Sequence, residues 1–277
     1  MTLEDVQGRP DTRGIALDAV GVTGLRYPIV ACDRDGAKQD TIGQITMAVA
    51  LPAQVKGTHL SRFVEVLHDH ATEISITTLP VILGALCDRL SAPAARLRVQ
   101  ATYFRERHAP VSRARSVLGY DVTWFAATDG DTMDVEFGVH VPVTSVCPCS
   151  KAISDYGAHN QRGHITVRVR THSRPAAAAE PLWLEDLIDL AERSASAPVF
   201  PLLKRPDERH VTMLAHDNPV FVEDMARNVA EQLRDDVRLA AFGVHAANDE
   251  SIHDHAAFAT VESPRPGSLI DTAWNRP

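Results

Sequence analysis

The chain has 277 residues, of which 44% are hydrophobic and 23% are charged, and its formal net charge is -8 at pH 7. This composition is typical of a folded globular protein and excludes a largely disordered chain, because enough apolar surface is present to offset chain entropy. The negative charge argues against a protein that coats nucleic acid, since such a protein needs a basic surface. No apolar run approaches the roughly 20 residues needed to cross a bilayer, so we expect no integral membrane protein.

The cysteines indicate the compartment. There are four, Cys32, Cys87, Cys147 and Cys149, and the first residues, Met1–Asp11, are polar and acidic, unlike a signal peptide. Without a secretory signal, reduced thiols and a cytoplasmic location are expected. Cys147 and Cys149 are also poor disulfide partners for each other, because residues at i and i+2 rarely reach disulfide geometry.

The first half of the chain contains both strand and helix signals. Apolar and β-branched runs predict strands, apolar residues at helical spacing predict helices, and proline or glycine marks their ends. In chain order, these patterns predict an arm over 1–23, strands over 25–32 and 41–51, a helix whose apolar stripe begins at Leu60, a helix between Thr78 and Pro93, and strands over 97–103 and 118–126. A turn over 128–131 closes this half.

The second half repeats this order with longer connections. In chain order, it predicts a strand over 133–143, a loop over 147–159, a strand over 165–169, a linker over 174–181, a helix over 184–191, a loop over 196–217, a helix capped by Asn218 with Pro219 in its first turn, and strands over 237–245 and 255–261. Each half therefore consists of strand, strand, helix, helix, strand and strand.

The repeated order predicts a duplicated α+β architecture. We expect a first module over 24–129 and a second module over 130–263, followed by a tail over 264–277. Each module should form an antiparallel sheet with helices on one face, and the other face would then be free to meet a partner.

The segment 141–164 carries the strongest chemical signal. Cys147, Cys149 and His159 lie within one loop between two predicted strands. Thiolate and imidazole are ligands of Zn²⁺ and other borderline transition metals, and a catalytic site takes about three protein ligands. The spacing is not that of a standard zinc finger, so a structured loop with a buried cysteine and a surface histidine is an equal alternative.

The segment 201–210 concentrates charged side chains around a proline. It includes Lys204, Arg205 and Glu208. Such a segment suits a solvated loop, and it equally suits a carboxylate metal ligand placed beside a phosphate clamp.

Two further places carry titratable groups. His253 and His255 would share a face if they lie on a strand, although such a pair is more often a surface feature. Glu223 falls in the first turns of the helix after Asn218, where a carboxylate favours the helix dipole. A carboxylate there could also face a nitrogen-rich base.

The order of these motifs resembles one known family. Four segments, 141–162, 202–208, 218–224 and 250–255, closely resemble the signatures of type IB GTP cyclohydrolase, and the resemblance covers about residues 12–263. It implies the tunnelling fold (T-fold), in which tandem modules of the predicted kind form half a barrel that oligomerisation closes. It also implies a homotetramer with active sites at subunit interfaces, which would cover sheet edges that a monomer exposes.

The resemblance also implies a reaction. Members of this family convert GTP and water to 7,8-dihydroneopterin triphosphate and formate, the first step of tetrahydrofolate (folate) biosynthesis. The chemistry needs an activated water, a proton shuttle, a carboxylate for the guanine edge and cations for three phosphates. The implied cofactor is Mn²⁺ or Zn²⁺, with Fe²⁺ as a third candidate, because a mixed sulfur, oxygen and nitrogen ligand set does not select one metal.

By the same resemblance, the site residues have separate roles. Cys147 and His159 are the implied catalytic residues, and Glu223 is implied to bind guanine. The implied metal ligands are Cys147, Glu208 and His253, with His159 left open as a further ligand or a proton shuttle. The phosphate-binding candidates are Lys151, Arg162, Lys204 and Arg205, and the additional site candidates are Cys149, Glu250 and His255.

Two alternatives stay open. Another tunnelling-fold enzyme, such as a pterin synthase or a deazaguanine nitrile reductase, would share recognition of a purine or pterin by a glutamate, and the reductase would add a covalent cysteine and a nicotinamide cofactor. A non-catalytic sensor of a nucleotide or metal would keep the fold. A sensor, however, has no need for both a proton shuttle and a guanine clamp.

Overall fold

The computed structural model describes residues 5–70, 73–172 and 180–263. The predicted tail and most of the predicted linker lie outside these residues. Over the described residues, the chain forms one sheet of ten strands and six helices. None of these helices is both long enough and apolar enough to span a bilayer.

The predicted strands and helices appear in the predicted order, with two short strands and two helices in addition. The strands are β1 (Leu17–Cys32), β2 (Lys38–Leu51), β3 (Glu73–Ile74), β4 (Ala95–His108), β5 (Arg115–Thr128), β6 (Met133–Val146), β7 (Asn160–Thr171), β8 (Ala197–Pro198), β9 (Leu239–Asp249) and β10 (Ala256–Glu262). The helices are α1 (Ser61–His70), α2 (Leu79–Leu90), α3 (Pro148–Ile153), α4 (Leu184–Arg193), α5 (Arg205–Asp217) and α6 (Val222–Arg234).

The sheet is continuous from one end of the molecule to the other. Its strand order is β10-β9-β7-β6-β5-β4-β2-β1-β3, and all its long neighbours are antiparallel. Both β1-β2-β4-β5 and β6-β7-β9-β10 run as meanders with helices inserted between their second and third strands. The predicted α+β class with an antiparallel sheet is therefore confirmed, whereas the module boundary near Asp129 stays a prediction.

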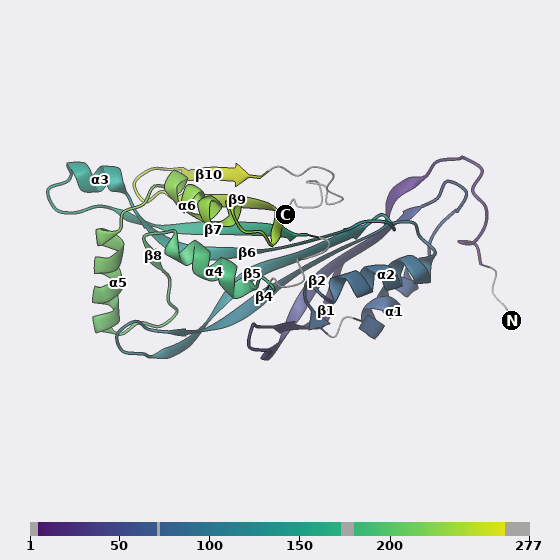
Figure 1. Cartoon of the computed structure of the whole chain (residues 1–277), viewed down its shortest axis with the longest axis horizontal. Coiled ribbons are helices and arrows are strands. Elements are labelled where there is room, and N and C mark those ends of the chain that lie inside the picture. Colours follow the sequence, from purple (N-terminus) through teal and green to yellow (C-terminus); the bar gives the residue numbers. More distant parts are fainter. Residues whose placement is uncertain (1–4, 71–72, 173–179, 264–277) are drawn as a thin grey trace.

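The core lies between the sheet and its helices. On β6, Val139, Val141 and Val143 alternate with more exposed neighbours, and each is almost fully buried. The helices add apolar stripes to the same core, which extends through both halves of the chain. Figure 1 shows α1 and α2 beside one end of the sheet and α3 and α5 at the other.

The first strand is longer than predicted. It begins at Leu17 rather than Leu25, so part of the expected N-terminal arm belongs to the sheet. Gly24 has a positive φ of 71°, and the pairing with β2 shifts register between Val22 and Leu25. This irregularity breaks the alternation of side chains while the pairing with β2 continues. The alternation in the sequence therefore did not predict the first part of the strand, residues 17–24.

The predicted loop over 196–217 is largely helical. It contains β8 and α5, and only Asp207 and Ala215 of α5 are buried. A helix with so few buried positions has no apolar stripe, so its sequence resembles a solvated loop. Asn218 ends α5 instead of capping the next helix, and α6 begins at Val222. The predicted loop over 147–159 also contains the short helix α3.

Asp207 attaches α5 to the rest of the molecule. Its Oδ1 accepts hydrogen bonds from the backbone N–H groups of Val111 and Ser112, both at 2.8 Å. Its Oδ2 accepts the Ser112 hydroxyl at 2.6 Å and the Lys204 N–H at 2.8 Å. Burial alone would raise the pKa of Asp207, but these hydrogen bonds outweigh burial and hold the pKa well below its usual value.

We expect Asp207→Asn to lower the melting temperature by several degrees at neutral pH, because an amide nitrogen cannot accept the hydrogen bonds that one carboxylate oxygen accepts. A lowered pKa stabilises the fold above the ordinary aspartate pKa, and this contribution is lost as the pH falls through that value towards the folded pKa. The difference from the wild type should therefore shrink below about pH 4. Thermal unfolding followed by circular dichroism at several pH values measures it, with the exposed Asp217→Asn as control. A pH-independent difference would contradict this role.

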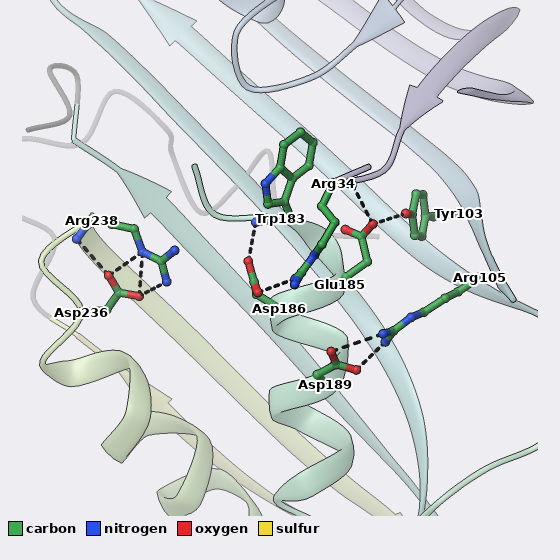
Figure 2. A network of polar contacts seen from close by, with 9 residues as sticks. All are labelled: Arg34, Tyr103, Arg105, Trp183, Glu185, Asp186, Asp189, Asp236 and Arg238. Carbon is green, nitrogen blue, oxygen red and sulfur yellow. Dashed lines mark hydrogen bonds and ion pairs between the residues drawn. The ribbon is translucent and has the colours of Figure 1, made fainter. Parts of the chain in front are cut away.

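Helix α4 joins the second half of the chain to the first through a ladder of carboxylates. Glu185, Asp189 and Glu192 lie on one face of α4, because they are separated by four and three residues. Their partners are alternate residues of β4, namely Tyr103, Arg105 and Arg107. Figure 2 shows the first two of these pairs, together with contacts of α4 to Arg34.

The ladder is buried along part of its length. The Tyr103 hydroxyl donates to Glu185 at 2.8 Å, and the Tyr120 hydroxyl donates to Glu192 at 3.0 Å. Burial raises the pKa of both tyrosines, so they remain neutral donors. Arg107 pairs with Glu192 at 2.8 Å, and only 11% and 8% of these side chains are exposed. Breaking such a pair leaves a buried charge without a partner.

Candidate functional site

A cavity of about 380 Å³ lies at the end of the sheet beside α3. Its walls come from the ends of β6, β7 and β9, from α3, from the start of α6 and from the connection between β9 and β10. It contains polar side chains on a face of the sheet that is otherwise apolar. The lining includes seven of the residues identified from sequence: Cys147, Cys149, His159, Glu223, Glu250, His253 and His255.

Three adjacent strands end in polar side chains at this cavity. The buried face of β6 runs through valines and ends at Ser145, that of β7 ends at Gln161, and that of β9 ends at Asn248. Ser145 pairs in register with Gln161, and Gly163 pairs with Asn248. The strand alternation thus brings three buried polar groups to the cavity, with exposed fractions of 1%, 8% and 3% in the order named.

A chain of hydrogen bonds fixes the start of α6 against β6. The Asn248 amide Nδ2 donates to Ser145 Oγ at 3.1 Å, and Ser145 Oγ donates to the Val220 carbonyl at 3.2 Å. The Val220 N–H donates in turn to the Val146 carbonyl at 3.1 Å. These contacts set the position from which α6 begins, and therefore the position of Glu223.

Cys147 and His159 lie at the two ends of the loop that contains α3. The Cys147 N–H donates to the His159 carbonyl at 3.2 Å, which closes the loop. The His159 N–H donates to Ser150 Oγ at 3.2 Å, and His159 Nδ1 is 2.9 Å from Ser251 Oγ. The contact with Ser251 occupies one ring nitrogen and leaves Nε2 without a hydrogen-bond partner among the described residues.

The connection between β9 and β10 contributes the other histidines. His253 was expected between the last two strands and His255 at the start of the last one, and in the structure both precede β10. Their rings nevertheless stack, with centroids 5.1 Å apart and planes 14° apart. Gln161 Nε2 donates to Glu250 Oε1 at 3.0 Å, which ties this connection to β7.

Glu223 is the second residue of α6, as the predicted place in the first turns requires. Its side chain is exposed and lines the cavity. A carboxylate in the first turn also interacts favourably with the helix dipole. Its two oxygens are thus available to hydrogen-bond donors of a bound molecule.

The remaining candidates lie elsewhere. Glu208, Lys204 and Arg205 are exposed at the start of α5, and none of them lines the cavity. Lys151 donates its Nζ to the His216 carbonyl near the other end of α5. Arg162 has the opposite parity to Gln161 on β7, so it lies on the other face of the sheet.

The donors around the cavity suit a borderline metal in their chemistry. Sulfur from Cys147 and imidazole nitrogens from His159 and His253 are ligand types that Zn²⁺ and related ions take. Within the described residues of one chain, however, no three histidine, cysteine or acidic side chains are placed to hold an ion. Helix α5 contacts α3 through His216, whose carbonyl accepts a hydrogen bond from Lys151. Glu208 lies about 12 Å from His216 along α5, towards the other end of the helix. The donor types fit a metal, and one chain does not assemble the implied ligand set.

Three buried polar residues at the cavity were not singled out from sequence. Ser145, Gln161 and Asn248 each occupy a position on the buried face of a strand whose other residues on that face are mostly apolar. A polar residue at such a position was the only sign in the sequence that could have identified them. Ser251, which contacts His159, carries no comparable pattern.

Known sequences match this chain over nearly its whole length. Residues 3–259 match the family described as type I GTP cyclohydrolase folE2. The chain is 48% identical to "GTP cyclohydrolase FolE2" of Nitrosomonas eutropha, over 94% of this chain and 95% of the relative. It is 46% identical to the protein of the same name from Nitrosococcus oceani, again over 94% and 95%.

The fold also resembles that of solved structures with low sequence identity. Uricase from Arthrobacter globiformis superposes with a TM-score of 0.51 at 11% identity, and the match covers 94% of this chain and 98% of that chain. At this level of identity, the likeness concerns the fold alone.

Proposed function

The chain belongs to the type I GTP cyclohydrolase FolE2 family, and from this membership we propose that it converts GTP and water to 7,8-dihydroneopterin triphosphate and formate, the first step of tetrahydrofolate biosynthesis. The observation that carries the proposal is the convergence of Cys147, His159, Glu223 and His253 on one cavity. These residues come from three separate parts of the chain, namely the loop that contains α3, the start of α6 and the connection between β9 and β10. A protein that only retained the fold would not need to keep all four side chains at one cavity.

Glu223 would bind the base. Guanine presents an N1–H and a 2-amino group side by side, and a carboxylate offers two acceptors that match them. Because α6 is held to β6 through Val220, the carboxylate is positioned before the substrate arrives. Preorganisation of this kind lowers the entropic cost of binding.

His159 would move the proton. Opening the imidazole ring of guanine requires a proton at a ring nitrogen as water adds to C8. Ser251 holds Nδ1 of His159 at 2.9 Å, so Nε2 is the nitrogen that can exchange a proton with substrate or water.

Cys147 and His253 offer donors for Mn²⁺, Zn²⁺ or Fe²⁺, and an ion bound there would lower the pKa of water at the site. His159 would be a third ligand only in place of its role in proton transfer, because Nε2 is the one ring nitrogen that its contacts with the described residues leave free. Glu208 would complete the ligand set. Since Glu208 lies on an exposed helix away from the cavity of its own chain, its participation requires either a shift of α5 or a contribution between subunits.

Assembly into a homotetramer would bring these parts together. The helix-free face of the sheet carries a polar groove of about 750 Å³ lined by residues that include His140, Thr166, Arg168 and His245. Strand β10 lies at the edge of the sheet, and the backbone groups on its side away from β9 could pair with a strand of another subunit. Lys204 and Arg205 on the exposed start of α5 would then supply positive charge to the triphosphate at a neighbouring cavity.

The four free thiols are consistent with an enzyme of the reducing cytoplasm.

Metal removal and reconstitution tests the proposal. We expect protein stripped with a chelator to release no formate from GTP, and we expect addition of Mn²⁺, Zn²⁺ or Fe²⁺ to restore formate release together with a fluorescent pterin after oxidation. The wild type before chelation is the control. Absence of formate with every metal would contradict the proposal, and consumption of NADPH with a deazaguanine nitrile would favour the reductase alternative.

A further inference from the structure

Gln161 has one end of its amide paired and the other unpaired. Its Nε2 donates to Glu250 Oε1 at 3.0 Å. Its Oε1 is buried and has no hydrogen-bond partner among the described residues. The side chain is only 8% exposed, and it lines the cavity that contains Glu223. A buried carbonyl oxygen without a donor destabilises the fold, so its presence beside a cavity points to a ligand.

The orientation of this amide follows from its partner. An ionised carboxylate can only accept hydrogen bonds, so the NH₂ group of Gln161 must face Glu250. The opposite orientation would place two acceptors against each other. The free atom of Gln161 is therefore an acceptor, and a molecule in the cavity would need to bring a donor to it.

Asn248 also has a buried oxygen without a partner, but its surroundings differ. Its Nδ2 donates to Ser145 Oγ, and its Oδ1 lies over Gly163 on β7. A Cβ built on Gly163 would be only 2.6 Å from that oxygen. Asn248 Oδ1 thus faces the backbone of the neighbouring strand, and Gln161 is the better placed of the two to receive a ligand donor.

Guanine supplies the donor that this acceptor needs. The base presents three donor hydrogens on one edge, one at N1 and two on the 2-amino group. The carboxylate of Glu223 can accept two of them, which leaves one amino hydrogen without a partner. We propose that Gln161 Oε1 accepts this third hydrogen and makes Gln161 a specificity-determining residue for the amino group. The inference rests on the proposed function, because it assumes that GTP occupies the cavity.

Comparison of GTP with inosine triphosphate tests the role, since inosine triphosphate lacks the 2-amino group. With metal-loaded enzyme, we measure kcat/KM for GTP and the inhibition constant of inosine triphosphate against GTP. Gln161→Met keeps about the same length of side chain and removes both the acceptor and the Nε2 donor to Glu250, and loss of that donor affects both nucleotides alike. We expect it to lower kcat/KM for GTP by about tenfold, mainly through KM, while the inhibition constant of inosine triphosphate changes by less than about twofold.

Controls separate this role from a structural one. Gln44→Met makes the same exchange at an exposed position of β2, and both constants should stay unchanged. Gln161→Asn keeps the amide but shortens its reach, so it should lose part of the preference for GTP even if the Met variant folds poorly. Thermal unfolding of each variant shows whether it folds.

Two other results for Gln161→Met would contradict the proposed role of Gln161. Equal weakening of both nucleotides by Gln161→Met would contradict the proposal, because it would assign the acceptor to a ribose hydroxyl or to the shape of the site. Unchanged constants would also contradict it, because water would then satisfy the oxygen. A wild-type enzyme that releases no formate would overturn the proposed function itself, whereas formate release with an unaltered nucleotide preference in the variant would overturn the role of Gln161 alone.

Discussion

Replacing Cys147 with alanine is expected to abolish formate release from GTP while part of the GTP affinity survives. In the proposed reaction the sulfur of Cys147 belongs to the catalytic ligand set, whereas the base is held by Glu223 from another element. Loss of a central catalytic group commonly lowers kcat by about a thousandfold or more. Turnover is measured as formate release, and binding is measured by equilibrium dialysis with labelled GTP.

The matched control for this variant is Cys87→Ala. Cys87 is a free thiol on α2, remote from the cavity, and burial raises its pKa. This variant should keep full turnover. Activity of Cys147→Ala equal to that of the wild type would remove Cys147 from the catalytic site, and an equal loss in both variants would indicate a general effect of losing a thiol.

Replacing Glu223 with alanine is expected to remove recognition of guanine. A carboxylate that accepts two hydrogen bonds from the base contributes charge-assisted bonds, which are stronger than neutral ones. We expect GTP affinity to fall about a hundredfold, and the preference for GTP over ATP to fall with it. Competition between the two nucleotides in an equilibrium binding assay measures both changes.

Glu231→Ala provides the control on the same helix. Glu231 is exposed on α6 and lies outside the cavity, so its removal changes the charge of the helix without touching the site. Binding of GTP should be unaffected in this variant. Unchanged affinity in Glu223→Ala would show that another group holds the base, and the specificity argument for Gln161 would then need a different partner.

Periodicity predicted most of the sheet. The alternation of valines on β6 and of Ile165, Val167 and Val169 on β7 follows directly from burial of one strand face, so these strands were expected at their observed places. The stripes of α2 and α4 were predicted for the same reason. Where buried residues recur at a regular spacing, the sequence alone predicts the helix or strand.

Elements without periodic burial were not predictable in this way. Helix α5 is fixed mainly by the four hydrogen bonds of one carboxylate, Asp207, and its partners at Val111 and Ser112 are distant in sequence. Its apolar pattern is therefore weak. The assignment of Asn218 as a cap failed because the same residue types favour helix ends and turns.

The candidate site shows the same division. Cys147, His159, Glu223 and His253 were identified from motifs, and they do line one cavity. Spacing could not reveal that Lys151 is engaged by α5, or that Arg162 lies on the opposite face of the sheet from Gln161. Such facts depend on which strands are neighbours, and a local pattern does not contain that information.

The carboxylate ladder of α4 has a consequence for folding. Its partners are separated by 82 to 85 residues along the chain, from Tyr103 and Glu185 to Arg107 and Glu192. Contacts that close so long a loop form only after much chain entropy has been lost, so they belong to the late steps of folding. Once formed, they make separate melting of either half costly, because it would break the buried pair between Arg107 and Glu192. We therefore expect the repeated architecture to unfold as one cooperative unit, and a chain cut between β5 and β6 would separate Arg105 and Arg107 from the carboxylates of α4.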